Sequence, residues 1–285
     1  MAWIVRLMFA AMLALAASGA AMAEGRRLAL VIGNGAYEAL PPLDNAVADA
    51  NSMARALRAQ DFDVTLLTDV GTEVFDAVLG TFARQAEGAD TVLFYYAGHA
   101  FQMNGVNHLV PVSARIDSAD TARSATWKLD DIAARLKGGS AQLLIFLDAC
   151  RNNPLPQSVP GAADGLAQFD GGAGTFVAFA TRPGAVAYDG TTGGSPFTQA
   201  LVNRIATPGQ SVSDLMIAVR NDVQQATGGA QVPWEQSSLR AQFYFTPAET
   251  GTAAAPEEVP QFDVVQSAST VGPAPVSAPA PSALP

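Results

Sequence analysis

The chain contains short apolar runs that end abruptly in glycine or polar residues, and this pattern narrows the possible folds. Three of the runs span residues 28–32, 91–96 and 142–147. None of them alternates strictly between apolar and polar side chains, so they are typical of strands buried on both faces of a sheet. Both faces of such a sheet must be covered. We therefore expect helices in the sequence segments between the strands.

Helices are predicted in the intervening segments. Residues 45–60 place apolar side chains three or four positions apart, as in an amphipathic helix. Strand and helix alternating along the chain predict an α/β fold with a mostly parallel sheet, whose ligands bind at the carboxyl ends of the strands. The further predicted elements are strands at 64–67, 176–180 and 243–245, and helices at 73–85, 129–136, 197–205 and 212–226.

The first 23 residues have the layout of a secretory signal peptide. A single basic residue, Arg6, precedes an apolar run at 7–17, and small residues end in Ala21-Met22-Ala23. The apolar run is short of the roughly 20 residues that a membrane-spanning helix needs, although an uncleaved N-terminal anchor is an alternative. Cleavage near Ala23 predicts an exported protein, periplasmic or secreted, without a membrane attachment.

The other end of the chain has a different composition. Residues 247–285 are dominated by Pro, Ala, Ser, Thr and Val and contain no Lys or Arg. Proline removes backbone donors and small side chains bury little surface, so we expect a disordered tail. The chemistry is therefore expected within residues 24–246.

Charge and cysteine content exclude several classes of protein. With 16 Lys and Arg against 26 Asp and Glu, the formal net charge is -10, which argues against a nucleic-acid surface. One cysteine forbids an intramolecular disulfide, and one cysteine with two histidines cannot build a Cys-rich zinc site. No metal and no cofactor are therefore predicted.

Two chemically useful residues follow predicted strands. His99 comes three positions after the end of the strand at 91–96, and Cys150 comes three positions after the end of the strand at 142–147. If these strands are parallel neighbours, imidazole and thiol lie at the same edge, where a base can activate the thiol as a nucleophile. Cys150 as a buried small apolar residue is the alternative, since free cysteines are often buried. The residue chemistry leaves both interpretations open.

At these residues the sequence resembles a known family. Tyr95-Tyr96-Ala97-Gly98-His99, followed 51 positions later by Cys150 within Asp148-Ala149-Cys150-Arg151, is similar to the histidine and cysteine boxes of caspase-like cysteine proteases, in particular bacterial metacaspases called orthocaspases. The resemblance covers about residues 26–246. Four further segments match in order: 43–50, 107–112, 195–198 and 231–235.

The resemblance implies a fold and a catalytic pair. The fold is the caspase-hemoglobinase fold, a mostly parallel six-stranded sheet flanked by helices on both faces. His99 and Cys150 would form the dyad, with Cys150 carrying a thioester acyl-enzyme. Backbone N–H groups of Cys150 and Ala100 would hold the oxyanion. The family usually has glycine at position 100, so a reshaped oxyanion pocket is expected, whereas His108 is expected to be structural.

The resemblance also implies a substrate. Metacaspase-like enzymes cleave after Arg or Lys with carboxylates that match Asp49 and Asp148, a pair suited to a guanidinium. Structural roles are the alternative for both. Asp49 lies in the first turn of a predicted helix, where the helix dipole favours an acid, and the alternative role of Asp148 is to orient a neighbouring loop. Ala97 stands where some metacaspases have a serine in this pocket. The predicted partners are peptides or proteins with a basic P1 residue, the residue preceding the cleaved bond.

The predicted function is an exported cysteine endopeptidase, and we expect a monomer. The alternatives are a catalytically silent caspase-homology binding or scaffold domain, and a transpeptidase that uses the same dyad. Calcium activation is common among metacaspases, but the sequence has no EF-hand-like loop to which it could be assigned.

The chain has no basic residue where caspases are cut into subunits. No Lys or Arg lies between Arg151 and Arg182. This stretch contains the predicted linker at 151–174, between a large-subunit-like part that ends at about residue 155 and a small-subunit-like part at 175–246. An enzyme that cleaves after basic residues cannot cut itself there. We expect any self-cleavage around Arg115, Arg123 or Lys128.

Overall fold

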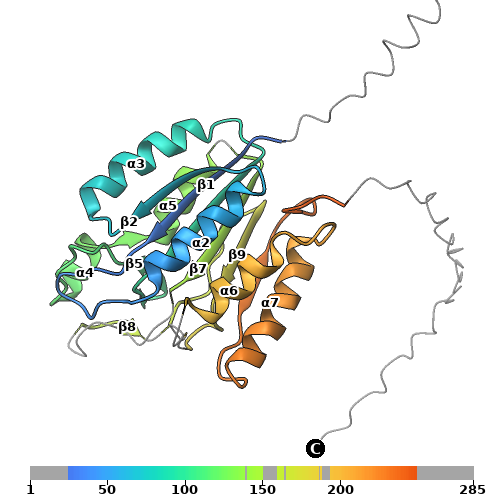
Figure 1. The fold of residues 1–285 in the computed structure, drawn as a ribbon. Helices are drawn as coiled ribbons and strands as arrows, with labels where there is room; N and C mark the ends of the chain where they lie inside the picture. Colours follow the sequence, from blue (N-terminus) through green and yellow to red (C-terminus); the bar gives the residue numbers. More distant parts are fainter. Residues whose placement is uncertain are drawn as a thin grey trace, which may run out of the picture. The chain divides into compact units, whose positions relative to one another are not determined.

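A computed structural model shows the fold of the chain (Figure 1). It describes residues 25–248 except 139, 150–158, 164, 186 and 188–192. The predicted nucleophile Cys150, the predicted signal peptide at 1–23 and the predicted tail from residue 249 onward lie outside the described residues.

The centre of the fold is a six-stranded sheet. Its strands are, in spatial order, β10 (Trp234–Ser237), β9 (Thr175–Phe179), β7 (Gln142–Asp148), β3 (Thr91–Ala97), β1 (Arg27–Gly33) and β2 (Asp63–Thr68). All neighbours pair in parallel except β10, which runs antiparallel to β9 at the edge. The apolar runs of β1, β3 and β7 are buried, as expected for strands covered on both faces. The predicted mostly parallel six-stranded sheet is confirmed.

Helices cover both faces of this sheet. α2 packs on β1 and also contacts α6, which contacts α7, whereas α3 contacts α5 on the other side (Figure 1). Among the described residues, no helix combines the length and the apolar character needed to cross a membrane. The helices are α2 (Ala46–Arg58), α3 (Thr72–Gln85), α4 (Ala119–Ser124), α5 (Leu129–Lys137), α6 (Pro196–Arg204) and α7 (Val212–Ala226).

One predicted strand is wrong. Residues 243–245 form no strand of the sheet; Tyr244 makes an isolated bridge with Ser211. Phe243 and Phe245 are buried, with ring centroids 4.9 Å apart in an edge-to-face contact. A short aromatic run has the same apolar signature whether it is a strand or an irregular segment packed on the core. The edge position belongs instead to β10. Its four residues show too little alternation between apolar and polar side chains for the sequence to predict a strand there.

A second, smaller sheet follows β3 and was not predicted. Its order is β6 (Trp127–Lys128), β5 (Val106–Leu109), β4 (Ala100–Met103) and β8 (Ala162–Ala163), all antiparallel. β8 lies within the predicted linker, so this part of the linker is paired to the domain. Farther along the linker, the side-chain amide of Asn107 clamps the backbone of Ala167, with bonds of 3.0 and 2.7 Å.

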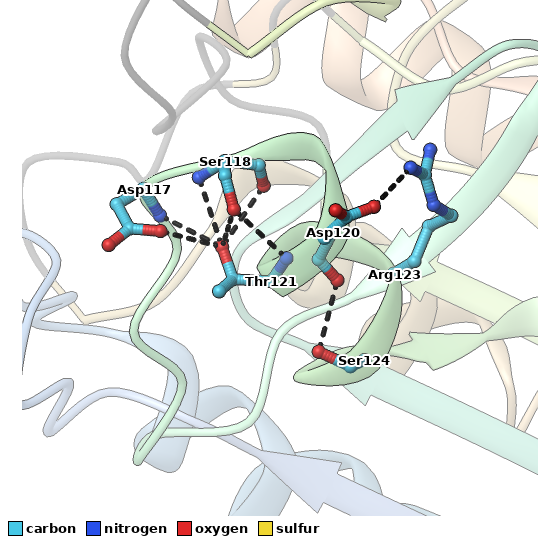
Figure 2. Close-up of polar contacts among 6 residues, drawn as sticks. All are labelled: Asp117, Ser118, Asp120, Thr121, Arg123 and Ser124. Atoms are coloured by element: carbon cyan, nitrogen blue, oxygen red, sulfur yellow. Dashed lines mark hydrogen bonds and ion pairs between the residues drawn. The ribbon is translucent and has the colours of Figure 1, made fainter.

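Helix α4 begins with a capping box, drawn in Figure 2. The Ser118 hydroxyl accepts from the backbone N–H of Thr121 at 3.2 Å, and the Thr121 hydroxyl accepts from the N–H of Ser118 at 3.0 Å. Arg123 and Asp120 form an exposed ion pair on the same turn. Because α4 has only six residues, it is too short to be stable on its own, and these local polar contacts help to fix its beginning.

Candidate active site

The predicted histidine and the predicted acid Asp148 come to the same edge of the main sheet. β3 and β7 are adjacent and parallel, and their register places Ala97 opposite Asp148. Just beyond, the backbone N–H of Gly98 donates to the carbonyl of Asp148 at 3.4 Å. His99 is the next residue on one chain segment. On the other, Cys150 follows Asp148 by two positions in the sequence and is outside the described residues.

Two tyrosine hydroxyls hold the backbone on both sides of His99. The His99 N–H donates to the Tyr37 hydroxyl at 2.7 Å. The Tyr96 hydroxyl lies 2.9 Å from the His99 carbonyl and 3.0 Å from the Val110 carbonyl, so its proton is shared between these acceptors. The two hydroxyls are 3.3 Å apart. The main chain at His99 is therefore fixed by buried side chains.

Gly98 gives these two hydroxyls the space they occupy. A Cβ atom on Gly98 would lie 2.6 Å from the Tyr96 hydroxyl and 2.7 Å from that of Tyr37. Both tyrosines are buried and hydrogen-bonded, so neither can move aside at low cost. The glycine of the Ala97-Gly98-His99 motif is thus explained by close approach.

The ring of His99 is oriented by a backbone carbonyl. Its Nε2 lies 2.8 Å from the Pro41 carbonyl oxygen, and the Tyr37 ring lies beside it with centroids 4.6 Å apart. Because a carbonyl can only accept a hydrogen bond, this contact assigns the proton of the neutral ring to Nε2. The lone pair is then on Nδ1, which becomes the basic nitrogen of His99.

Ala100 keeps an ordinary backbone conformation. It begins β4, lies opposite Leu109 and is not among the residues with positive φ. Since Val110 N–H donates to the His99 carbonyl at 3.0 Å, Ala100 occupies a non-hydrogen-bonded position of the antiparallel pair. Its N–H therefore points away from β5. Alanine is therefore unstrained at this position, because the backbone does not require a left-handed conformation there.

Asp49 and Asp148 are brought together by Ser195, the N-cap of α6. The backbone N–H of Ser195 donates to both oxygens of Asp49 at 3.1 and 3.2 Å, and the Ser195 hydroxyl forms a short hydrogen bond with Asp148. Gly194, with φ of 125°, passes so close to Asp49 that a Cβ atom would lie 2.5 Å from its Oδ1. Asp49 is 3% exposed.

Both carboxylates also act on the phenol of Tyr95. Burial raises the pKa of the Tyr95 phenol well above its usual range, and the negative charges of Asp148 and then Asp49 raise it further. Both charges therefore act on the same buried hydroxyl. Tyr95 stays protonated and can serve only as a neutral hydrogen-bonding group.

A pocket of about 240 Å³ opens between α2 and α6. Asp49 lines it, whereas Asp148 is not among its lining residues. The two predicted carboxylates are thus joined through Ser195, but in this structure they do not line this cavity together. The lining consists of Asp49, Ser52, Gly193, Thr198, Gln199, Val202 and Asn203.

His108 is placed away from this edge, inside the small sheet. Its Nδ1 is 2.7 Å from the Thr126 hydroxyl, which itself donates to the Ala122 carbonyl at 2.5 Å, so Nδ1 is the donor. Its ring is stacked on Phe101 with centroids 5.1 Å apart. Burial, followed by the charge of Lys128, lowers the pKa of His108. Across the part of the chain that the structure describes, no three His, Cys, Asp or Glu side chains gather as a metal site would require.

Sequence reasoning did not identify Tyr37, Pro41 or Ser195 as site residues. The first two lie in an irregular segment after β1, where no periodicity signals a role. Ser195 had a usable signal, because Ser followed by Pro is a typical beginning of a helix, with serine as N-cap and proline at the first helical position.

Comparison with known proteins identifies the family. Residues 26–244 match the model of the caspase domain, and the chain belongs to this family of caspase-like cysteine peptidases. Over 137 residues it is 28% identical to mucosa-associated lymphoid tissue lymphoma translocation protein 1 of Homo sapiens and to its Mus musculus homolog. That match covers 47% of this chain and 16% of each relative.

A solved structure shares the fold. Caspase-1 from Spodoptera frugiperda is similar with a TM-score of 0.58 and 19% sequence identity. The similarity covers 80% of this chain and 93% of that chain.

Proposed function

We propose that this chain is a cysteine endopeptidase of the metacaspase and orthocaspase type that cleaves peptide bonds after Arg or Lys. Membership of the caspase family supports a cysteine peptidase in general. The observation that carries the catalytic assignment is the ring of His99. Its Nε2 proton is committed to the Pro41 carbonyl, so its lone pair is on Nδ1, at the strand edge that leads to Cys150.

The reaction then has two acyl-transfer steps. Nδ1 of His99 takes the Cys150 thiol proton, and the sulfur attacks the substrate carbonyl carbon. The C–N bond breaks, the amine leaves with the proton from His99, and a thioester remains. Water adds to the thioester with His99 as base, releasing the carboxylic acid and restoring the thiol. The Ala100 N–H, which points away from β5, is suited to stabilise the oxyanion.

Asp49 and Asp148 are the proposed recognition groups for the basic P1 side chain. A guanidinium or ammonium group can pair with carboxylates that are shielded from water, where charge-assisted hydrogen bonds are strong. The contacts of both carboxylates with Ser195 support a shared role.

We also propose a location and an oligomeric state for the protein. The layout of residues 1–23 supports export to the periplasm or medium after cleavage near Ala23. We propose a monomer whose partners are peptides or proteins with a basic P1 residue.

Activity on fluorogenic peptides with Arg, Lys or Asp at P1 tests the proposal. We expect wild type to hydrolyse the Arg and Lys peptides, and Cys150→Ala and His99→Gln each to lose about a thousandfold or more in kcat/KM, because the dyad acts as a unit. His108→Gln is the matched control, since it changes the other histidine of the chain, and it should retain turnover.

Three results of the hydrolysis test would contradict the proposed function. Turnover by neither wild type nor Cys150→Ala would favour the scaffold alternative. A preference for Asp would overturn the assignment of Asp49 and Asp148. Transfer of the acyl group to an added amine in place of water would favour the transpeptidase alternative.

A further inference from the structure

A chain of buried hydroxyl groups ends on Asp148. The Tyr95 hydroxyl is 2.5 Å from the Thr198 hydroxyl, which in turn donates to Oδ2 of Asp148 at 2.7 Å. Tyr95 is fully buried in β3, and Thr198 is 1% exposed in the first turn of α6. The Ser195 hydroxyl donates to the same carboxylate oxygen. Tyr95 of β3, Thr198 of α6 and the N-cap Ser195 thus form one hydrogen-bond network that ends on a single oxygen of Asp148.

The direction of each hydrogen bond follows from the donors available. An ionised carboxylate can only accept, so the protons of Thr198 and Ser195 are both used on Asp148. The oxygen of Thr198 must then accept from Tyr95, and the oxygen of Ser195 accepts from the Thr198 backbone N–H at 3.0 Å. The high pKa of Tyr95 agrees with this order, because the phenol keeps its proton.

This arrangement matters for a carboxylate that has to bind a cation. Two hydroxyl donors on one oxygen favour the ionised form and restrict rotation of the carboxylate, yet they bring no positive charge that would compete with a basic ligand. The donors are themselves buried, so water does not replace them readily.

We propose that Thr198, with Tyr95 behind it, is a positioning residue for substrate specificity: it holds Asp148 ionised and oriented toward the basic P1 side chain. This inference rests on the proposed function, in which Asp148 contacts that side chain. In this role Thr198, which is 1% exposed and whose hydroxyl donates to Asp148, acts through Asp148.

The test compares hydrolysis of two peptides that differ only in having Arg or the uncharged isostere citrulline at P1. In wild type we expect a large Arg-to-citrulline ratio of kcat/KM. Thr198→Val keeps the shape of the side chain but removes the hydroxyl, and should reduce that ratio by about ten- to a hundredfold. Thr198→Ser should restore most of it. Tyr95→Phe should give an intermediate loss, because Thr198 keeps its bond to Asp148 but loses its own donor.

The outcomes separate this inference from the proposed function. If wild type itself does not prefer Arg over citrulline, the proposed P1 specificity fails, and this inference with it. If wild type prefers Arg and Thr198→Val keeps the ratio, only the role of Thr198 is overturned. A merely structural role would lower both kcat/KM values equally and leave the ratio unchanged. Should Thr198→Val not fold, a wild-type ratio in Tyr95→Phe overturns the inference, and a reduced ratio supports it.

Discussion

The backbone at His99 is held by side chains rather than by regular secondary structure. His99 lies two positions after the end of β3 and directly before β4, and the hydroxyls of Tyr37 and Tyr96 bond to its N–H and carbonyl. Leaving a buried N–H or carbonyl without a partner costs about 1–3 kcal/mol. The two phenols therefore fix the backbone of His99, and with it the position of the imidazole.

Gly98→Ala tests this placement. The added Cβ would clash with both phenol oxygens, so we expect a loss of about 1–3 kcal/mol in the free energy of unfolding and a loss of peptidase activity through displacement of His99. Urea unfolding and peptide hydrolysis measure the two effects.

Gly80→Ala is the matched control. In the middle of α3 the nearest atom to its new Cβ would be an Arg84 nitrogen at 3.9 Å, and alanine favours the helix by about 0.5–1 kcal/mol. This variant should be more stable than wild type and fully active. Equal behaviour of the two variants would contradict the close approach at Gly98.

Among the elements, the long and strongly apolar ones were predictable, and the short ones were not. β1, β3 and β7 lie where the buried runs predicted them, because burial on both faces demands an apolar side chain at every position. α4 depends on a capping box of local polar contacts, and β8 has only two residues paired to β4. Neither α4 nor β8 has a periodic pattern of apolar residues that could be detected in the sequence.

The burial of His108 in β5 should make stability depend on pH. Burial lowers the pKa of His108 in the folded state, so below about pH 6.5 the unfolded chain binds a proton that the folded chain does not. Stability should therefore fall as pH decreases from about 6.5 toward the folded-state pKa. Urea unfolding at pH 7.5 and pH 5 measures this loss.

His108→Gln removes the titrating group and should show a smaller loss of stability between these two pH values than wild type. His99 and all acidic residues are common to both proteins, so the difference isolates His108. Equal slopes for wild type and variant would contradict the assignment.

In the molecule as a whole, the described part of the segment between the two subunit-like parts, residues 159–163 and 165–174, is anchored to the domain at several points. Val159, Leu166 and Phe169 are buried, and Asn107 clamps the backbone at Ala167. A protease needs an exposed, extended segment, so this packing opposes cleavage in addition to the lack of Lys and Arg.

We therefore predict that the active enzyme is not cut between residues 152 and 181. Of the three basic residues proposed for self-cleavage, Arg123 lies in α4 and Lys128 in β6, whereas Arg115 lies in an irregular segment with its side chain 77% exposed. Mass spectrometry of purified active protein should show an intact chain or a cut after Arg115, and Arg115→Gln should abolish that cut. A cut between residues 152 and 181 that disappears in Cys150→Ala would contradict the prediction.

The local pattern of the sequence was enough for the class of fold and for the positions of its central strands. It also led to His99 and Cys150, because polar residues just beyond buried strands are visible without coordinates. Asp49 and Asp148 followed only from the resemblance to metacaspase-like enzymes. Only folding joined Asp49 to Ser195, which is 146 positions away, and placed Tyr37 and Pro41 around His99. Periodicity reports burial along one segment, whereas these contacts arise between segments that the parallel sheet brings to a common edge.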